Sequence, residues 1–351
     1  MKRYICFFGI IFFLFAMMGC NGKINTLKST NSHNVRIGVV ETTAMEYKSI
    51  IHWYDDNLNK VSEQKLKYAM LGTVFNNPVY TKDEVYMIPQ GLGNKKDSKK
   101  VISINKKDMK IKEYTINQIG LNGVAVSGDY IYTINTFNGD TYISRLNKFN
   151  NELEEIILNN EYISGLTAVR GKIYAFSSNL STISPELNLY IYNEDLELID
   201  KKDITKYGTS QYKFMHDEDS LYTGVMITKE DEPSNIILQI SLNSNKVEAI
   251  NTGEYYPNDI LLYKDNIIVT HNDLVINEGN TLTVLDKDCQ AVRVIDLENK
   301  TELAGILKNY LVVGNQEKIC LYDIEDNFKL TKEKSIQKGE NSYISNIIIL
   351  E

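Results

Sequence analysis

The densest group of side chains able to do chemistry is the segment MHDEDS, in which three acidic residues follow a histidine. Carboxylate oxygens are the ligands that a hard cation such as Ca²⁺ prefers. His216, Asp217 and Asp219 are therefore the candidate ligands of a weak Ca²⁺ site. A short acidic run of this kind is also typical of a solvated hairpin turn that holds no ion. The sequence favours the solvated turn and predicts no other cofactor.

Other residues that commonly build active sites are scarce. The chain has four histidines, and His33, His52 and His271 share no ligand spacing with His216. Neither a P-loop, a dinucleotide-binding fingerprint nor a Gly-x-Ser-x-Gly motif occurs. No catalytic residue is predicted, and the sequence favours a protein that is not an enzyme.

Short strands must position these residues, because two hairpin patterns recur along the chain. The first is a turn followed by an apolar strand, spaced 42 to 48 residues apart at Tyr86, Tyr132, Tyr174, Tyr222, Ile268 and Leu311. The second is an Asn- or Asp-rich bend between alternating apolar residues. It opens seven times, at Asp55, Asn105, Asn147, Asn193, Asn243, Asp286 and Asp323. Asn and Asp tolerate positive φ and bond to their own turn backbone, which suits tight hairpins.

Two hairpins per repeat of about 45 residues give four strands, the size of a β-propeller blade. Residues 35–351 hold 317 residues, enough for seven such blades. A β-sandwich, the rival all-β fold, would not require a repeated pair of hairpins. The predicted fold is therefore an all-β, seven-bladed propeller of four-stranded antiparallel blades.

The first and last strands of the propeller region together supply the strands of one blade. Seven copies of the second pattern accompany six complete copies of the first, and the missing hairpin is at the start. The last strand, which reads YISNI from Tyr343, aligns with YISGL from Tyr162 in a later unit. We therefore expect Ser345 to Leu350 to pair with Val35 to Val40, so that the C-terminal strand closes the first blade and removes two exposed edges.

One repeat resembles a known family. The stretch from Asp265 to Leu297, DNIIVTHND followed by GNTLTVLDKDCQAVRVIDL, is similar to the YVTN-type, WD40-like propeller repeat. The other units share with this repeat only its alternation of strands and turns. The resemblance implies a propeller in a bacterial extracytoplasmic setting, and propellers host many unrelated functions.

Known propeller enzymes have characteristic sets of active-site residues, and two of these sets do not fit this sequence. A sialidase-like site needs three converging arginines, whereas Arg145 is expected on a third strand and Arg170 at a hairpin bend. Trp53 is the only tryptophan, too few for the repeated tryptophan motifs of quinone-dependent dehydrogenases. A lactonase- or lyase-type metal site in the central funnel stays open as the alternative.

Aromatic side chains remain as candidates for binding. Several stand just before the innermost strand of a blade, where the connecting loop opens on the central channel: Tyr162, Tyr212, Tyr255, Tyr256, Tyr343 and Phe75. Tyrosines there could stack sugars or grip a peptide. The same rings could instead fill the space between blades, since tyrosine is a common strand former.

The first residues predict the location. Lys2 and Arg3 precede an uncharged apolar run from Tyr4 to Met18, too short to span a bilayer and typical of a signal peptide. Residues 17–20, Met-Met-Gly-Cys, resemble the bacterial lipobox, although Leu is commoner at the first position. The resemblance implies a signal peptide over 1–19, lipidation of Cys20 and a linker over 20–34. Two acyl chains anchor a protein stably to the extracytoplasmic face of the cell membrane.

The net charge limits the classes of binding partner, and the cysteine positions bear on whether a disulfide forms. Without residues 1–19, which hold two bases and no acid, 36 basic residues face 46 acidic ones, a net charge of −10. That balance argues against nucleic acid, which requires a basic surface. Cys289 and Cys320 fall in different repeat units, which favours two buried free thiols over the disulfide that an exported protein can form. The predicted protein is a monomeric, non-catalytic module for a protein, peptide or wall glycan, or else a platform subunit of an envelope complex.

Overall fold

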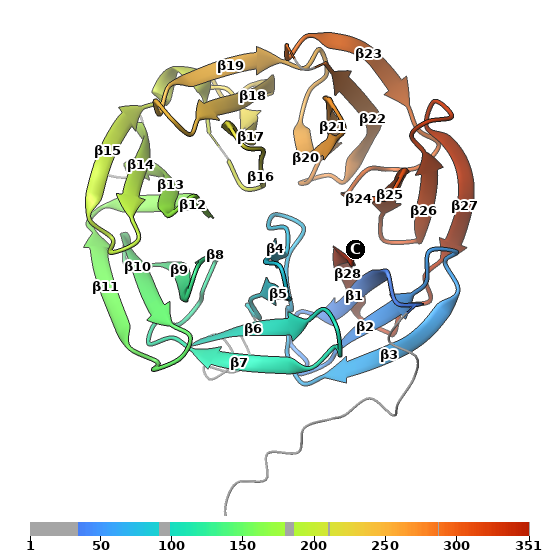
Figure 1. Cartoon of the computed structure of the whole chain (residues 1–351), viewed down its shortest axis with the longest axis horizontal. Coiled ribbons are helices and arrows are strands. Elements are labelled where there is room, and N and C mark those ends of the chain that lie inside the picture. The colour runs from blue at the N-terminus through green and yellow to red at the C-terminus, as the bar shows by residue number, and fades with distance from the viewer. Residues whose placement is uncertain (1–33, 91–98, 180–185, 210, 287, 351) are drawn as a thin grey trace, which may run out of the picture. The chain divides into compact units, whose positions relative to one another are not determined.

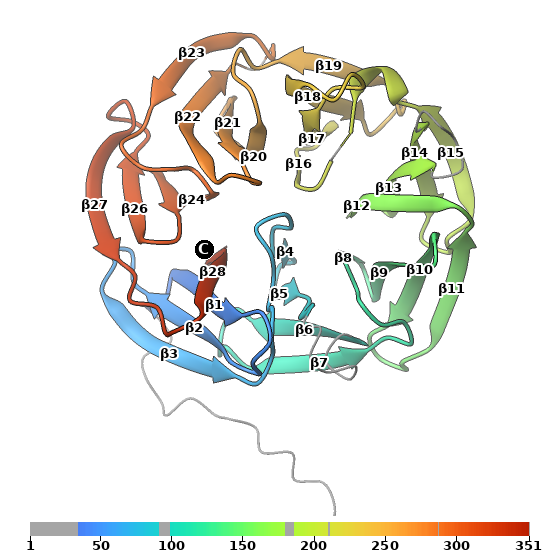
Figure 2. The same cartoon turned by 180° about the vertical axis from the view of Figure 1, so that it is seen from behind.

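The computed structural model describes residues 34–90, 99–179, 186–209, 211–286 and 288–350. Within these ranges the chain forms seven four-stranded antiparallel sheets arranged as blades around a central axis (Figures 1 and 2). The predicted seven-bladed propeller is confirmed. The signal peptide over 1–19, the lipidated Cys20 and the linker up to His33 lie outside the described residues and stay predictions. Among the described residues, no helix is both long and apolar enough to cross a bilayer.

Each blade runs from an innermost strand to an outermost one. Blade 1 holds β28 (Ser342–Ile349), β1 (Ile37–Thr43), β2 (Ser49–Tyr54) and β3 (Lys60–Leu66). Blade 2 holds β4 (Val79–Tyr80), β5 (Glu84–Met87), β6 (Lys100–Asn105) and β7 (Ile111–Thr115). Blade 3 holds β8 (Gly123–Ser127), β9 (Tyr130–Phe137), β10 (Asp140–Asn147) and β11 (Leu153–Leu158). Blade 4 holds β12 (Glu161–Val169), β13 (Lys172–Asn179), β14 (Leu187–Asn193) and β15 (Leu198–Asp203).

The last three blades follow the same order. Blade 5 holds β16 (Phe214–His216), β17 (Ser220–Ile227), β18 (Pro233–Ser241) and β19 (Val247–Asn251), preceded by a short 3₁₀ helix over Thr205–Tyr207. Blade 6 holds β20 (Pro257–Tyr263), β21 (Asn266–Asp273), β22 (Glu278–Leu285) and β23 (Ala291–Asp296). Blade 7 holds β24 (Leu303–Leu307), β25 (Tyr310–Gly314), β26 (Lys318–Asp323) and β27 (Lys329–Ser335).

Antiparallel blades divide the connections between two faces. The connections from one blade to the next and the hairpins between second and third strands share one side, which we call the loop face. The remaining hairpins, between first and second and between third and fourth strands, lie on the opposite side, the turn face. The seven Asn/Asp-rich bends all lie on the turn face.

Those bends are built by side-chain acceptors rather than by positive φ at the first residue. Asp55 Oδ1, for example, accepts the backbone N–H groups of Asn57 and Asn59 at 2.8 Å each. Positive φ falls three or four residues further on, at Leu58 in this turn. In blade 5 the prediction of Asn243 was wrong, because Ser241 occupies the first position and its Oγ accepts the N–H of Ser244. A serine hydroxyl can replace Asn or Asp in this role.

The predicted closure of the first blade is confirmed. Strand β28 pairs antiparallel with β1, from Ile37 opposite Ile349 to Thr43 opposite Ser342. The likeness between the end and the middle of the chain has a structural cause, because both strands bulge at the serine of the shared lettering. Ser345 Oγ donates to Leu71 O at 2.6 Å and lies 3.4 Å from Val40 O, while Ser164 Oγ donates to Phe176 O at 3.4 Å.

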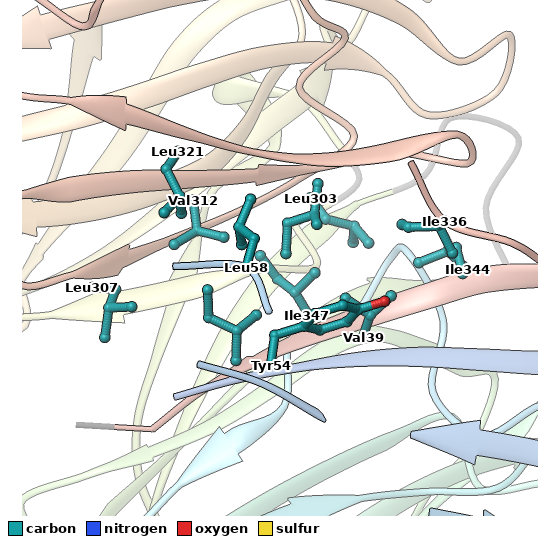
Figure 3. Close-up of a cluster of buried hydrophobic side chains, with 12 residues drawn as sticks. Val39, Tyr54, Leu58, Leu303, Leu307, Val312, Leu321, Ile336, Ile344 and Ile347 are labelled. Atoms are coloured by element: carbon teal, nitrogen blue, oxygen red, sulfur yellow. The ribbon is translucent and has the colours of Figure 1, made fainter. Parts of the chain in front are cut away.

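An apolar cluster joins blade 1 to blade 7 beneath this closure. Figure 3 shows Ile344 and Ile347 of β28 between side chains of the two blades, among them Val39 and Leu303. The side chain of Ile349 lies against Gly305, where a built Cβ would be only 2.7 Å away, so that strand β24 needs glycine there. The terminal strand is thus part of the hydrophobic core.

A buried polar network reinforces the same junction. Glu41 Oε1 on β1 accepts Gly339 N, from the connection before β28, at 2.8 Å, and Ser342 Oγ, from the first residue of β28, at 2.7 Å. Its Oε2 lies 2.6 Å from His52 Nε2. Burial alone would raise the pKa of Glu41, but the hydrogen bonds from Ser342, His52 and Gly339 together lower the pKa below its usual 4.5.

This network predicts an acid-sensitive closure. A carboxyl group whose pKa is lowered by folding contributes stability above its unfolded pKa, and that contribution is lost as the pH falls through the folded value. We expect the stability advantage of the wild type over Glu41→Gln to shrink as the pH falls below 4.5. Urea unfolding of both proteins from neutral pH downward measures it, and parallel stability curves would contradict the assignment. Glu63, 3.8 Å from His52, is present in both proteins.

Candidate binding site in the central channel

The connection between β3 and β4, residues 67–78, projects into the centre of the ring (Figure 1). We call it the plug. Asn76 Nδ2 donates to Asn122 O at 2.9 Å, and Asn77 Nδ2 donates across the channel to Asp259 Oδ1 at 2.9 Å. Gly72 begins its inward path with φ +71, and a Cβ there would meet Met87 Cε at 2.7 Å. Only glycine fits a site that combines positive φ with such close packing.

A buried ion pair stands opposite the plug. Lys213, just before β16, places Nζ 3.0 Å from Asp259 Oδ2 on β20, and the two residues are 5% and 0% exposed. Asp259 also accepts Ala304 N at 3.0 Å and Asn258 Nδ2 at 3.4 Å. Every donor around this carboxylate is a cation or an N–H group. The arrangement suits a buried, compensated charge rather than a metal ligand.

Between the plug and the innermost strands of blades 3 to 5 lies a cavity of about 280 Å³. Its wall combines apolar side chains with amides and hydroxyls, among them Asn76, Asn77, Tyr80, Leu166, Lys213 and Phe214. Strands β4, β8, β12 and β16 are the inner edges of their sheets, so unpaired backbone N–H and C=O groups face the channel. The site can therefore both donate and accept hydrogen bonds.

Two ionisable side chains near the channel have shifted pKa values. Tyr80 Oη accepts Ile349 N at 3.0 Å, and burial of this hydroxyl raises the pKa of Tyr80 to about 12, although the side chain as a whole is 42% exposed. Burial also raises the pKa of Glu302, an effect that hydrogen bonds from Gln316 and Asn277 reduce. Both groups are thus held more strongly in their neutral forms.

Three of the six predicted aromatic residues gather beside this cavity. Phe75 of the plug meets Tyr212 edge to face, with ring centroids 5.5 Å apart. Burial, followed by the neighbouring Tyr212, raises the pKa of Tyr162. Because Tyr212 also lines the cavity, this aromatic cluster of Phe75, Tyr162 and Tyr212 borders it. A role of the cluster in binding stays a prediction.

The other three predicted aromatic residues lie elsewhere. Tyr255, 58% exposed, and Tyr256, with φ +56, lie in the connection before β20. Tyr343 is on the closing strand, where burial raises its pKa. Among the described residues, the ring contacts join none of the three to the aromatic cluster.

The acidic turn at His216 belongs to the turn face. Asp217 Oδ1 accepts the N–H groups of Asp219 and Ser220 at 2.7 Å each, and Oδ2 accepts Tyr222 Oη at 3.0 Å. The carboxylate of Asp217 therefore builds its own hairpin. Within the described part of the chain, no three His, Cys, Asp or Glu side chains are grouped as a metal site would need.

The remaining predicted residues are placed as follows. Arg145 lies on a third strand, β10, and bonds Glu154 and Asp195. Arg170 lies at the β12–β13 turn, as expected. Cys289 and Cys320 are free thiols, but only Cys320 is fully buried, because Cys289 occupies a turn. Burial raises the pKa of the Cys320 thiol to about 12.

The residues that define the channel could not be recognised from local sequence patterns. Asn77, Lys213 and Asp259 lie 46 to 182 residues apart. No local pattern links them, and each alone reads as an ordinary loop or strand residue. One signal was present: residues 67–78 make a long connection between blades, and long connections often carry function.

Comparison with known proteins supports the architecture. No protein-family model matches the chain, and no curated protein matches its sequence. A functionally unknown protein from Desulfotomaculum acetoxidans shares 13% identity at a TM-score of 0.61, over 90% of this chain and 98% of that one. AztD from Citrobacter koseri shares 10% at 0.56, over 90% and 97%.

BamB from Moraxella catarrhalis shares 10% identity at a TM-score of 0.51, over 88% of this chain and 89% of that one. Identities this low establish a common fold and do not carry a function from one protein to another. What these solved structures share with the chain is its architecture alone: the chain is similar to them as a β-propeller.

Proposed function

We propose that this protein is a lipoprotein on the extracytoplasmic face of the cell membrane, whose propeller binds a protein partner through its loop face without catalysis. The proposal rests on the predicted lipidation of Cys20 together with one structural observation. Exposed apolar side chains gather on the face opposite the point where the predicted tether joins the fold.

The exposed large apolar residues of the described chain are unevenly placed. Phe137 ends β9 at the loop face, and seven others lie in loop-face connections and hairpins: Met45, Tyr47, Phe75, Ile119, Tyr255, Val275 and Ile276. Of the remaining ones, Phe149 lies in a turn-face bend, Tyr80 is on β4, and Ile157, Leu198, Ile199 and Val294 are on outermost strands. Val275, in the β21–β22 hairpin, is 86% exposed. Exposed apolar groups collected on one side of a protein are typical of a surface that contacts another protein.

The predicted tether joins the opposite side. Arg36 N donates to Tyr54 O, beside the Asp55 turn of the turn face, and Leu350 N donates to Arg36 O, each at 2.8 Å. The linker therefore meets the propeller at the turn face. In a protein anchored through Cys20, the tether would leave the propeller at the turn face and would not cover the loop face.

Site-specific photo-crosslinking in intact cells tests this function. A crosslinking amino acid at Ile276 on the loop face should capture one protein partner, because the side chain is exposed among the other apolar residues. The same group at Phe149, on the turn face, is the matched control and should capture none. In a Cys20→Ser variant the protein should leave the membrane fraction and lose the Ile276 crosslink.

Each other outcome has a distinct meaning. Equal crosslinks from Ile276 and Phe149 would contradict a binding face on the loop side. Several different partners captured from separate loop-face positions would favour a platform subunit over a single-partner module. Retention of the Cys20→Ser protein in the membrane fraction would contradict the lipid anchor.

A further inference from the structure

The cavity between the plug and blades 3 to 5 is part of the central channel around which the blades are arranged. Blade 2 begins with only two paired residues in β4, and the plug before it crosses the channel to Asp259. The plug therefore narrows the channel and forms one wall of a cavity of about 280 Å³.

The cavity is large enough for one small molecule. Ligand pockets commonly measure roughly 300–1,000 Å³, so this one is at the small end of the range. It can hold a single ring with its substituents and excludes a longer chain.

The charge balance disfavours ionic ligands. Lys213 is the buried cation in the cavity wall, and its charge is already compensated by Asp259 at 3.0 Å. His216, the other basic side chain in the wall, is exposed at its hairpin turn. An added anion would compete with Asp259, and an added cation would face the Lys213 ammonium. Bringing an unpaired charge into such a site is costly. The cavity therefore favours a neutral ligand.

The wall provides hydrogen-bonding groups beside apolar surface. Lys213 has three N–H donors, of which one is directed to Asp259. Asn76, Asn77 and Thr73 add amides and a hydroxyl from the plug, and the edge strands add backbone donors and acceptors. Asn76 and Asn77 already donate to Asn122 O and Asp259 Oδ1 through Nδ2, but a purely apolar ligand would use none of the hydrogen-bonding capacity that remains in this wall.

An aromatic ring completes the site. Tyr80 lines the cavity with 42% of its surface exposed, and the bond from Ile349 N to its hydroxyl fixes the ring. Lys106 Nζ lies over the Tyr80 ring, 5.5 Å from its centroid, so a ligand would stack on the other face of that ring. Tyr212 and Phe214 also line the cavity. A fixed aromatic ring with mixed donors and acceptors around it matches a molecule that has both apolar C–H faces and hydroxyl groups.

We propose that this cavity binds one neutral sugar ring, with Tyr80 as the stacking surface and Lys213 and the plug amides as hydrogen-bonding groups. The proposal is independent of the protein partner on the loop face and of the lipid anchor. A cell-wall glycan end or a free sugar would present the same chemistry.

Isothermal titration of the full-length protein in detergent tests the proposal. The probes are glucose, galactose and N-acetylglucosamine as neutral rings, and glucosamine and glucuronate as rings of similar size that carry one charge. At least one neutral sugar should bind, and both charged sugars should bind at least about tenfold more weakly than it does, as a charge left unpaired requires. No binding of any neutral sugar, or stronger binding of a charged one, would overturn the proposal.

Two variants locate the binding. Tyr80→Ala should weaken binding of the neutral sugar by about tenfold, because stacking on an aromatic ring is lost. Tyr255→Ala removes another exposed tyrosine, which lies outside the cavity, and should leave binding unchanged. Should Tyr80→Ala fail to fold, Thr167→Trp, which fills the cavity from β12, replaces it with the same expectation. Unchanged affinity in whichever cavity variant folds, Tyr80→Ala or Thr167→Trp, would show that the sugar binds elsewhere.

Whether the sugar is free or part of a chain is decided by competition. A soluble wall fragment that ends in the sugar that binds should displace that sugar if the chain end enters the cavity. Absence of displacement would assign the site to the free sugar.

Discussion

Removing Tyr343 to Glu351 is expected to destroy the cooperative unfolding of the propeller or to lower its melting temperature strongly. The segment buries Ile344, Ile347, Ile348 and Leu350, each nearly inaccessible to water. Burial of one such side chain contributes about 1.5–3 kcal/mol, and a whole domain is stable by only about 5–15 kcal/mol. Its loss also exposes the edge of β1 to other chains and uncovers the blade 7 side chains that pack against β28. Calorimetry of the truncated protein measures the effect.

A peptide added in trans is the control for this truncation. A synthetic peptide of residues 341–351 should restore the melting transition, because β28 is also held by Gln316, which exchanges hydrogen bonds of 2.9 Å with both backbone groups of Ile344. The same peptide with Ile347 and Ile348 replaced by Asp should not restore it. A truncated protein that melts at the temperature of the full chain would disprove the closure.

Asp259→Ala is expected to be the most damaging single substitution in the channel. It leaves the ammonium of Lys213 buried without its carboxylate and removes the acceptor of Asn77 and of the Ala304 N–H group. Breaking a buried pair by removing one partner costs about 3–5 kcal/mol. Urea unfolding of the variant measures the loss.

Two further variants test whether the unpaired buried charge causes the loss of stability in Asp259→Ala. The double variant Asp259→Leu with Lys213→Met should recover much of the stability, because it leaves no unpaired charge. Glu248→Ala breaks the exposed pair with Lys246, 2.7 Å apart, and should cost no more than about 1 kcal/mol. If Asp259→Ala is as mild as Glu248→Ala, then the ion pair does not hold the plug and the inner strands in place.

The fold could be predicted from the sequence because its information is local and repeated. Each hairpin has its own bend residue and its own alternation of apolar side chains, and the count of seven bends fixes the number of blades. The end of the chain was predictable for the same reason, since the YIS lettering of β28 and β12 marks the same bulge in two strands. One repeat differed, where Ser241 replaces the expected Asn243, because several small polar residues can cap the same turn.

The candidate site was only partly predictable. Phe75, Tyr162 and Tyr212 lie beside the cavity because a propeller brings the connections before its innermost strands to one face. Sequence position alone could not show that Tyr255, Tyr256 and Tyr343 would be turned elsewhere, because the direction of a loop side chain depends on neighbouring blades.

The sequence by itself determined the number of blades, their strand order, the closing strand and the negative charge of the chain. Each of these depends on a pattern repeated within about 45 residues or on composition. Only the tertiary structure decided that the plug crosses the channel, that Lys213 pairs with Asp259, and that a cavity remains beside them. These contacts join residues from separate blades, and the ring geometry that brings them together arises only after every blade has packed against its neighbours.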